Sequence, residues 1–429
     1  MKNRQDDHRA AIEKMGCPFY LYDETLLSQR IETIRRALPG IGVCFAMKAA
    51  PALAGVIKER VDRLEVCSTG EYAICFEKKV APEKILVSGV NKSEESLRWT
   101  VDRLRDRGSY TIESEHHFQL LDAMAAELGS KLSCYIRLSS GNQFGVDRKT
   151  LLQLCEKVIA SPHLELAGIH YFSGTQKTIK RIEKELCELA AYGQELQQRL
   201  GRELSLEYGP GLSVNCFYKG QDGLQQKSAS AAQEAILQEA ADCEEQLREL
   251  GRILEETRIR EVFGDITFEY GRFLAASCGF YFSRVADLKT TEGVNYAILD
   301  GGLHQITYFG SMAGMKLPYI DAIDGSTYEL KQDAEKSDYL LAGSLCSAND
   351  VLVRKAALPA LSIGDILRFS LAGAYCSTEG ISLFLTRDLP ALALLSEDHA
   401  IEPLRGHIGT GRLNAPNQQD PGFLPYSYY

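Results

Sequence analysis

Short apolar runs alternate with stretches of helical periodicity over the first 270 residues of the chain. In the stretch 23–38, for example, Leu27, Ile31, Ile34 and Leu38 recur every three or four positions, and 149–160 has a similar pattern. The apolar runs predict strands at 42–47, 63–68, 84–89, 109–114, 132–138, 166–172, 203–209 and 265–271. Strands that are each followed by a helical stretch predict an α/β fold, a TIM-type (β/α)8 barrel, whose usual length is about 250 residues.

The pattern changes after about residue 272. Strand-like runs such as "GFYFSRVADLK" and "DILRFSLAGAY" follow each other with glycine-rich or polar breaks, which is typical of a mostly-β domain of the β-sandwich or Greek-key kind. We therefore expect a barrel over 16–270 and a C-terminal β domain over 271–429, with residues 1–15 packing on the β domain. A long insertion, 213–262, has the pattern of one long helix or a helix pair, and the tail 411–429 is expected to be extended.

Composition narrows the class of protein. The net charge of −10 excludes a broadly basic nucleic-acid surface, and no apolar run approaches the ~18–20 residues that a membrane span needs. The first residues, "MKNRQDDHRA", are polar and predict no signal peptide. Twelve cysteines without framework spacing are expected to be reduced and mostly buried. A cytoplasmic protein with no nucleic-acid or membrane partner is expected.

Polar and glycine residues follow most of the predicted barrel strands, where such barrels carry their chemistry. Each one alone has an ordinary structural explanation, such as a solvated rim lysine, a satisfied histidine or a tight turn. The prediction depends on their joint placement at one mouth. The set is Lys48, Glu65, Glu71, Arg137, His170, Ser173, Gly209, Gly211, Glu269 and Arg272.

Two segments near the end of the barrel favour phosphate. "YGPGL" (208–212) offers backbone N–H groups that approach an anion closely, and "EYGR" (269–272) adds a guanidinium. Lys48, in "FAMKAAP", is then placed for a Schiff base with pyridoxal 5'-phosphate (PLP). Glu269 is placed to pair with the pyridine nitrogen, and His170 to stack on the ring.

Eight motifs in order resemble the fold-type III PLP-dependent decarboxylases, the group of diaminopimelate, ornithine and arginine decarboxylases. They are "FAMKAAP", "VCSTGEY", "HYFSGTQ", "EYGPG", "EYGR", "LDGG", "GSLCSANDVL" and "GAY". The resemblance runs from 18–23 to 373–377. It implies a PLP-dependent carboxy-lyase that removes the α-carboxylate of a small-molecule amino acid, and a homodimer with shared active sites.

The resemblance also implies residue roles. Lys48 would carry the cofactor, Glu65 would set the electrostatics near it, and His170 would stack on its ring. Cys346 would enter the partner subunit's site as proton donor. The cofactor-binding set would be Lys48, Glu65, His170, Ser173, Gly209, Gly211, Glu269, Gly271, Arg272 and Tyr375. Ser347, Asp350 and Tyr375 would contact the substrate, and no metal is expected.

Several departures from the family concern the substrate. The diaminopimelate and ornithine branches carry an acidic residue directly after the loop cysteine, where this chain has Ser347, with Asp350 three positions later. The diaminopimelate branch has an arginine after "DGG", whereas 300–318 contains only Lys316. The loop 136–147 is shorter than its diaminopimelate counterpart, and "EYGPG" replaces three glycines in a row. Burying the charged far end of such a substrate without oppositely charged protein partners would cost binding free energy.

These departures favour a specialised or conjugated amino acid. Plain meso-diaminopimelate decarboxylation and a carrier-protein-bound substrate remain open, although the net charge of −10 disfavours docking an acidic carrier. An alanine-racemase-like enzyme would place an arginine at the pyridine nitrogen, where this chain has Glu269. A regulatory relative would have lost Lys48 or Arg272, and a metal-dependent hydrolase would need more histidine and aspartate at the strand ends.

Overall fold

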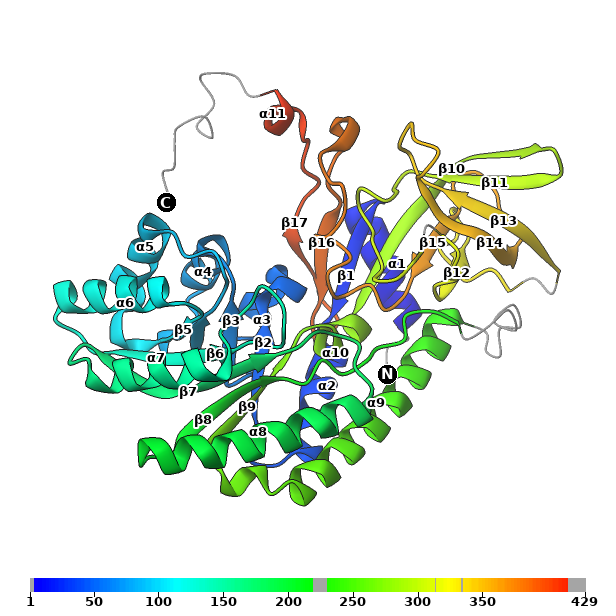
Figure 1. The fold of residues 1–429 in the computed structure, drawn as a ribbon. Coiled ribbons are helices and arrows are strands. Elements are labelled where there is room, and N and C mark those ends of the chain that lie inside the picture. The colour runs from blue at the N-terminus through cyan, green and yellow to red at the C-terminus, as the bar shows by residue number, and fades with distance from the viewer. Residues whose placement is uncertain (1–3, 219–229, 313, 333–334, 416–429) are drawn as a thin grey trace. The chain divides into compact units, whose positions relative to one another are not determined.

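A computed structural model of the chain describes residues 4–218, 230–312, 314–332 and 335–415. The chain divides into two compact units, a barrel unit (28–214 and 242–274) and a β unit (1–27, 215–241 and 275–429). The predicted barrel and the separate mostly-β domain are both confirmed, and Figure 1 shows the elements of each.

Eight parallel strands close the barrel because β2 pairs with β9 as well as with β3. Each predicted strand is present, within a few residues of its expected limits. The strands are β2 (Gly42–Ala46), β3 (Arg63–Val66), β4 (Ile85–Val87), β5 (Ser109–Ile112), β6 (Leu132–Leu138), β7 (Leu164–Phe172), β8 (Leu204–Gly209) and β9 (Phe263–Tyr270). Their side chains are mostly buried, as expected for a parallel sheet covered by helices.

Helices connect the strands, and their ends follow local chemistry. At the start of α7, for example, the Asp147 carboxylate accepts from the backbone N–H of Lys149 and Thr150, and α8 ends at Gly201 with φ +63°. The helices are α2 (Glu24–Ala37), α3 (Ala54–Ile57), α4 (Thr69–Glu77), α5 (Glu94–Leu104), α6 (Glu115–Leu128), α7 (Arg148–Ala160), α8 (Ile179–Leu200), α9 (Ala231–Glu256) and α10 (Arg272–Ala275).

The described part of the insertion contains one long helix, α9. Its first turn is capped by Asp321, whose Oδ1 and Oδ2 accept from the N–H of Ala231 and Ala232 at 2.6 and 2.9 Å. Arg368 pairs with the same carboxylate at 2.7 Å. Part of the predicted insertion, 219–229, lies outside the described residues.

The β unit is one nine-stranded sheet in which the hydrogen-bonded path runs β14-β13-β11-β10-β1-β16-β17, with β12 and β15 attached through β10. The long β10 joins the two halves, because its first part pairs with β1 and β15 and its second part with β11. The strands are β1 (Phe19–Asp23), β10 (Gly279–Thr291), β11 (Val294–Leu299), β12 (Ile320–Ile323), β13 (Lys336–Ala342), β14 (Val351–Pro359), β15 (Ile366–Phe369), β16 (Ala391–Leu395) and β17 (Ile401–Arg405).

The barrel does not begin at residue 16, and this expectation is corrected. Strand β1 pairs antiparallel with β10 and parallel with β16, so 16–27 belongs to the β unit. Phe19 stacks on Phe282 with ring centroids 4.6 Å apart. Helix α1 (Arg4–Met15) lies on the same sheet, where His8 contacts the Phe280 and Phe282 rings and Lys14 Nζ donates to the carbonyl of Ile401.

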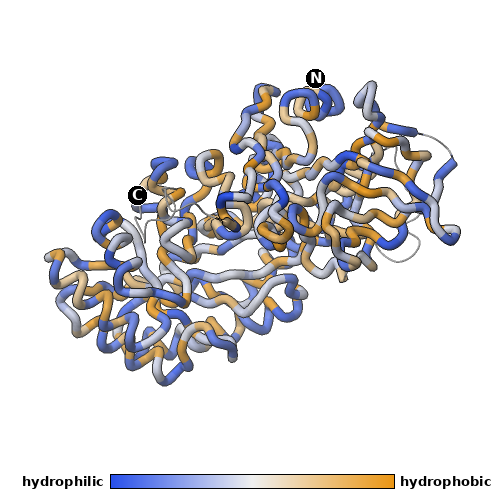
Figure 2. Tube along the Cα trace, turned by 90° about the horizontal axis from the view of Figure 1, so that it is seen from above, coloured by the Kyte–Doolittle hydropathy of each residue, from blue (hydrophilic) through white to orange (hydrophobic). Residues whose placement is uncertain are grey.

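At the other end of the chain, residues 411–414 form a short helix, α11 (Gly411–Asn414), instead of the expected extended tail. The rest of that tail, 416–429, lies outside the described residues. Figure 2 shows hydrophobic and hydrophilic residues interspersed along the chain. Within the described ranges, every helix is too short or too polar to cross a membrane.

Candidate active site

Lys48 lies just after β2, in a short 3-10 turn (Met47–Ala49) rather than in the strand itself. Its Nζ bonds Glu65 Oε2 at 2.9 Å and lies 5.9 Å from the centre of the Phe172 ring. The lysine side chain is 39% exposed, whereas Glu65 is buried. The amine is therefore accessible at the mouth of the barrel, and the buried Glu65 carboxylate holds it in position.

The environment of Glu65 favours its charged form. Burial alone would raise the pKa of this carboxyl, but Lys48 and the Ser88 hydroxyl, which donates to Oε1, lower it to about 2. Cys67 lies 3.5 Å from Lys48 Nζ, and burial raises the pKa of its thiol to about 12. The thiol next to the lysine therefore stays protonated at neutral pH.

His170 and Glu269 lie next to each other inside the barrel. Nε2 of His170 bonds Oε2 of Glu269 at 3.3 Å, and both side chains are buried. Nδ1 of His170 has no hydrogen-bond partner among the residues that the structure describes, and Oε1 of Glu269, which makes no hydrogen bond, lies 3.2 Å from His170 Nε2. Buried polar atoms of this kind are rare in the absence of a ligand, because leaving them unpaired costs about 1–3 kcal/mol each.

The turn after β8 is shaped by two glycines. A Cβ on Gly209 would lie 2.4 Å from Phe172 Cδ2, and a Cβ on Gly211, which has φ +59°, would lie 2.2 Å from the Gly174 carbonyl oxygen. A larger residue at Gly211 would require the backbone to move, and one at Gly209 would displace the Phe172 side chain. The turn therefore lies directly against the segment 172–174 that follows β7. Arg272, at the start of α10 and after Gly271, is 5% exposed.

A buried cation that we did not predict joins these two segments. Lys177 Nζ donates to Ser173 Oγ at 3.2 Å and to the Gly209 carbonyl at 3.0 Å, and the Lys177 backbone N–H donates to the Gly211 carbonyl. Its ammonium pairs with Glu185 at 2.6 Å. The sequence signal was a lysine directly after "HYFSGTQ", where it looked like a solvated loop residue.

Glu185 compensates this buried charge. It also accepts from Ser173 Oγ, from Tyr208 OH at 2.9 Å and from Arg181 Nε at 3.1 Å. Burial would raise the pKa of Glu185, but the bonds from Lys177 and Ser173 lower it on balance. Burial in turn lowers the pKa of Lys177, although Glu185 opposes this shift. The cluster fixes the two segments expected to hold a phosphate.

A second ion pair lies at the ends of β5 and β6. Arg137 Nη1 lies 3.4 Å from Glu113, and its guanidinium covers the Phe144 ring at 4.8 Å. Lys92 is buried 4.0 Å from the same carboxylate, and burial lowers its pKa to about 8. Arg137 is thus at the barrel mouth, as expected, but it is engaged by Glu113.

The remaining predicted residues belong to the β unit. Cys346 is exposed and Ser347 half-buried on the segment between β13 and β14. Tyr375 has φ +66°, in the left-handed region that a tyrosine rarely adopts and that is often found at functional positions.

Asp350 is not placed to bind substrate, and this expectation is corrected. Its side chain is buried, and its two oxygens accept from the backbone N–H of Leu303 and Leu345 at 2.7 and 2.8 Å. A Cβ on Gly302 or Gly343 would come within 2.5 Å of this carboxylate. Asp350 therefore fastens the "DGG" segment to the "GSLC" segment.

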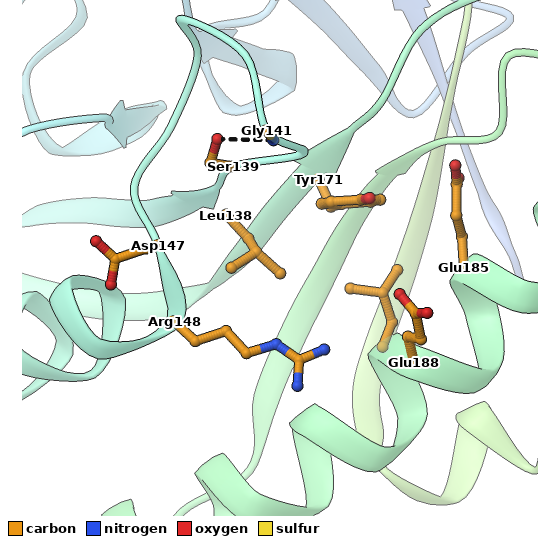
Figure 3. A pocket seen from close by; sticks show the side chains of 9 residues that line it. Leu138, Ser139, Gly141, Asp147, Arg148, Tyr171, Glu185 and Glu188 are labelled. Carbon is orange, nitrogen blue, oxygen red and sulfur yellow. Dashed lines mark hydrogen bonds between the residues drawn. The ribbon is translucent and has the colours of Figure 1, made fainter.

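A pocket of about 300 Å³ lies in the barrel unit beside the ends of β6 and β7 (Figure 3). Its lining is Leu138, Ser139, Gly141, Asp147, Arg148, Tyr171, Glu185, Glu188 and Leu189. None of the predicted cofactor residues lines it, so it is distinct from the candidate cofactor site. Glu185 is the link between the two, because it lines the pocket and accepts a hydrogen bond from Ser173.

Comparison with known proteins places the chain in a family. The family described as "Pyridoxal-dependent decarboxylase, C-terminal sheet domain" matches residues 19–373. The chain is 26% identical to the diaminopimelate decarboxylase of Zymomonas mobilis, over 89% of this chain and 88% of that protein. It is 26% identical to the 2-[(L-alanin-3-ylcarbamoyl)methyl]-2-hydroxybutanedioate decarboxylase of Staphylococcus aureus (88% and 94%). It is 25% identical to the L-glutamyl-[BtrI acyl-carrier protein] decarboxylase of Niallia circulans (94% and 94%).

Solved structures share the fold. The diaminopimelate decarboxylase of M. jannaschii in complex with L-lysine superposes with a TM-score of 0.77 at 21% identity, covering 97% of this chain and 95% of that one. The Vibrio vulnificus lysine/ornithine decarboxylase complexed with cadaverine gives a TM-score of 0.71 at 20% identity, covering 91% and 98%.

The residues present fit pyridoxal phosphate. The barrel unit contains an accessible lysine amine, a turn whose Gly211 leaves no room for a Cβ, and a buried His170 Nδ1 without a hydrogen-bond partner among the described residues. A phosphate, an aldehyde and a ring nitrogen are the complementary groups. The chain belongs to the pyridoxal-dependent decarboxylase family, and it is an amino acid decarboxylase that uses pyridoxal phosphate.

Proposed function

We propose that the chain decarboxylates an amino acid whose far end is conjugated, or at least carries no free ammonium and carboxylate pair. The observation that supports the proposal most is that neither of the two described positions expected to contact the substrate's far end, Ser347 and Asp350, offers it an uncommitted charge. Ser347 stands where related branches carry an acid, and Asp350 is occupied by backbone amides. Within the described part of 300–318, Tyr308 is buried and donates to the Ser370 carbonyl.

Two relatives support a conjugated substrate. The name of the Staphylococcus aureus enzyme describes an alanine unit attached through an amide to a hydroxybutanedioate, and that of the Niallia circulans enzyme describes a glutamyl group on a carrier protein. In both, the decarboxylated amino acid has a far end without a free ammonium. Diaminopimelate decarboxylases are similarly related, so meso-diaminopimelate is the alternative substrate.

The proposed site uses the barrel residues to hold the cofactor. Lys48 would bear it, Glu269 would pair with its ring nitrogen, and His170 would pack on its ring. Ser173, Gly209, Gly211, Gly271 and Arg272 would bind its phosphate. Pyridoxal phosphate supplies the electron sink for the pair left by the departing carboxylate. Glu65 holds the lysine amine in place before substrate arrives.

The proposed proton donor is Cys346 of a partner subunit. Its thiol is exposed, so it is available to a second copy of the chain. It would protonate the carbon that has lost its carboxylate, and Ser347 would line the same space. The active form is therefore proposed to be a homodimer, which sedimentation of the loaded protein measures directly.

A substrate panel tests the proposal. We would measure CO2 release from meso-diaminopimelate, L-lysine and L-ornithine, and from amide conjugates of 2,3-diaminopropionate and L-glutamate. The account expects the conjugates to have the higher kcat/KM. Ser347→Asp should raise activity on L-lysine and L-ornithine and lower it on the conjugates. Highest activity on free meso-diaminopimelate would contradict the proposed substrate class and leave the decarboxylase assignment intact.

A further inference from the structure

A second buried carboxylate lies behind Glu269. Glu207, on β8, has a fully buried side chain. The ligand atoms of Cys44, Glu207 and Glu269 all lie within 4.8 Å of one another. Strand β9 pairs with both β2 and β8, which brings these three side chains together inside the barrel. Two carboxylates so close in a water-poor interior influence each other's charge strongly.

One cation partly neutralises this pair. Arg63 Nη1 bonds Glu207 Oε2 at 2.5 Å and Tyr135 OH at 3.2 Å, and the guanidinium lies 5.3 Å from the centre of the Tyr135 ring. On the other side, His170 Nε2 bonds Glu269. The charged and titratable groups around Glu207 include Arg63 from β3, Cys44 from β2, Glu269 from β9, His170 from β7 and Tyr135 from β6.

A metal ion is a poorer explanation of this cluster. Cysteine and carboxylate side chains can ligate metals, but Glu207 Oε2 is already bonded to the Arg63 guanidinium. A divalent cation there would be repelled by that guanidinium. Because a metal ion is disfavoured there, we assign the buried Glu207 carboxylate an electrostatic role.

We propose that Glu207 is a positioning residue that balances the Arg63 charge behind Glu269 and so keeps the cofactor ring nitrogen protonated. The inference rests on the proposed function, in which Glu269 faces that nitrogen. With Glu207 ionised, the charges of Glu207 and Arg63 cancel, and the negative charge of Glu269 acts on the ring alone. Without Glu207, the buried Arg63 cation opposes Glu269 and disfavours a protonated ring.

The ionisation of Glu207 is itself sensitive to pH. Burial raises the pKa of Glu207, Arg63 and His170 oppose this shift and Glu269 adds to it, and together they bring the pKa to about 7. The net charge of the Glu207–Arg63 pair behind Glu269 therefore changes close to neutral pH.

The test is the nitrogen-15 resonance of ring-labelled pyridoxal phosphate bound to the full-length protein. The wild type should show a protonated ring nitrogen. Glu207→Gln should move the resonance toward the unprotonated position, which corresponds to about tenfold lower proton affinity. The charge-neutral double variant Arg63→Gln/Glu207→Gln should restore the wild-type position, which a merely structural role would not do. Glu165→Gln, an exposed carboxylate on β7, should leave the resonance unchanged.

Each outcome decides something. A folded Glu207→Gln variant with the wild-type resonance, or a double variant that fails to restore it, overturns the inference. If Glu207→Gln does not fold, Glu207→Asp, which keeps the charge, should retain the wild-type resonance, and a resonance displaced toward the unprotonated position overturns the inference. An unprotonated ring in the wild type, or no change in Glu269→Gln, contradicts instead the proposed role of Glu269.

Discussion

Replacing Lys177 with methionine would remove a buried charge and keep most of the side-chain volume. The Lys177 ammonium is fully buried and bonds Ser173, Glu185, Tyr208 and Gly209. In Lys177→Met the Glu185 carboxylate loses its closest counter-ion. The same change removes the side-chain bonds that join the Gly209 carbonyl to Ser173, both proposed phosphate ligands, and leaves the backbone bond from Lys177 to Gly211.

The expected cost follows from the partners that remain. Breaking a buried ion pair by removing one partner costs about 3–5 kcal/mol, whereas removing both partners costs much less. Glu185 would keep the Tyr208 hydroxyl and the partly exposed Arg181, so the lower end applies. We expect Lys177→Met to lower the free energy of unfolding of the barrel by about 3 kcal/mol, and Lys177→Met/Glu185→Leu to recover most of that loss.

Urea unfolding of the cofactor-free protein measures this change. The chain has a single tryptophan, Trp99, on barrel helix α5, where it contacts Tyr72 and Arg103. Its fluorescence therefore reports on the barrel.

Lys157→Met is the matched control. It breaks an exposed pair with Glu115 and should cost less than about 1 kcal/mol. The reasoning would be refuted if Lys177→Met unfolded like that control, or if the double variant were less stable than the single one. The cofactor should also dissociate faster from Lys177→Met than from the control.

Three further predictions concern other parts of the molecule. Because the folded-state pKa of Glu207 is raised from 4.5 to about 7, the folded barrel binds an extra proton in that window, and its stability should fall as pH rises from 4.5 to 7. Glu207→Gln should flatten this dependence in the Trp99 assay, and an unchanged profile would contradict it. Asp350→Ala should leave two backbone amides unpaired and lower stability by about 2–4 kcal/mol at equal substrate KM, whereas a selective rise in KM would restore a substrate role. Cys346→Ser should lower kcat for decarboxylation while the cofactor remains bound, and an unchanged kcat would remove the thiol from the chemistry.

Periodicity predicted the barrel because its signal is local. Each strand from β2 to β9 is an apolar run next to a helical repeat, and the pattern needs no knowledge of distant partners. Strand β1 shows the limit of this reasoning. All five residues of its run "FYLYD" are buried, so the pattern suits a strand of either domain. Only pairing with β10 and β16, far along the chain, assigns it to the β unit.

The sequence predicted the residues of the candidate site whose role follows from a motif. It did not predict the roles of residues that depend on burial and on distant partners. Lys48 and the Gly209–Gly211 turn stand out by residue type and position. Asp350 looked like a substrate ligand because sequence does not reveal that backbone amides use both of its oxygens. Glu207 went unnoticed because its partner, Arg63, is 144 positions away. Such pairs form only when the barrel closes.

The most direct test of the account is to locate the cofactor on the chain. Borohydride reduction of the protein loaded with pyridoxal phosphate, followed by peptide mass spectrometry, should place the label on Lys48, and Lys48→Ala should remove both the label and the visible absorption band. Label on another lysine, or an unchanged band in Lys48→Ala, would contradict the assignment of the active site.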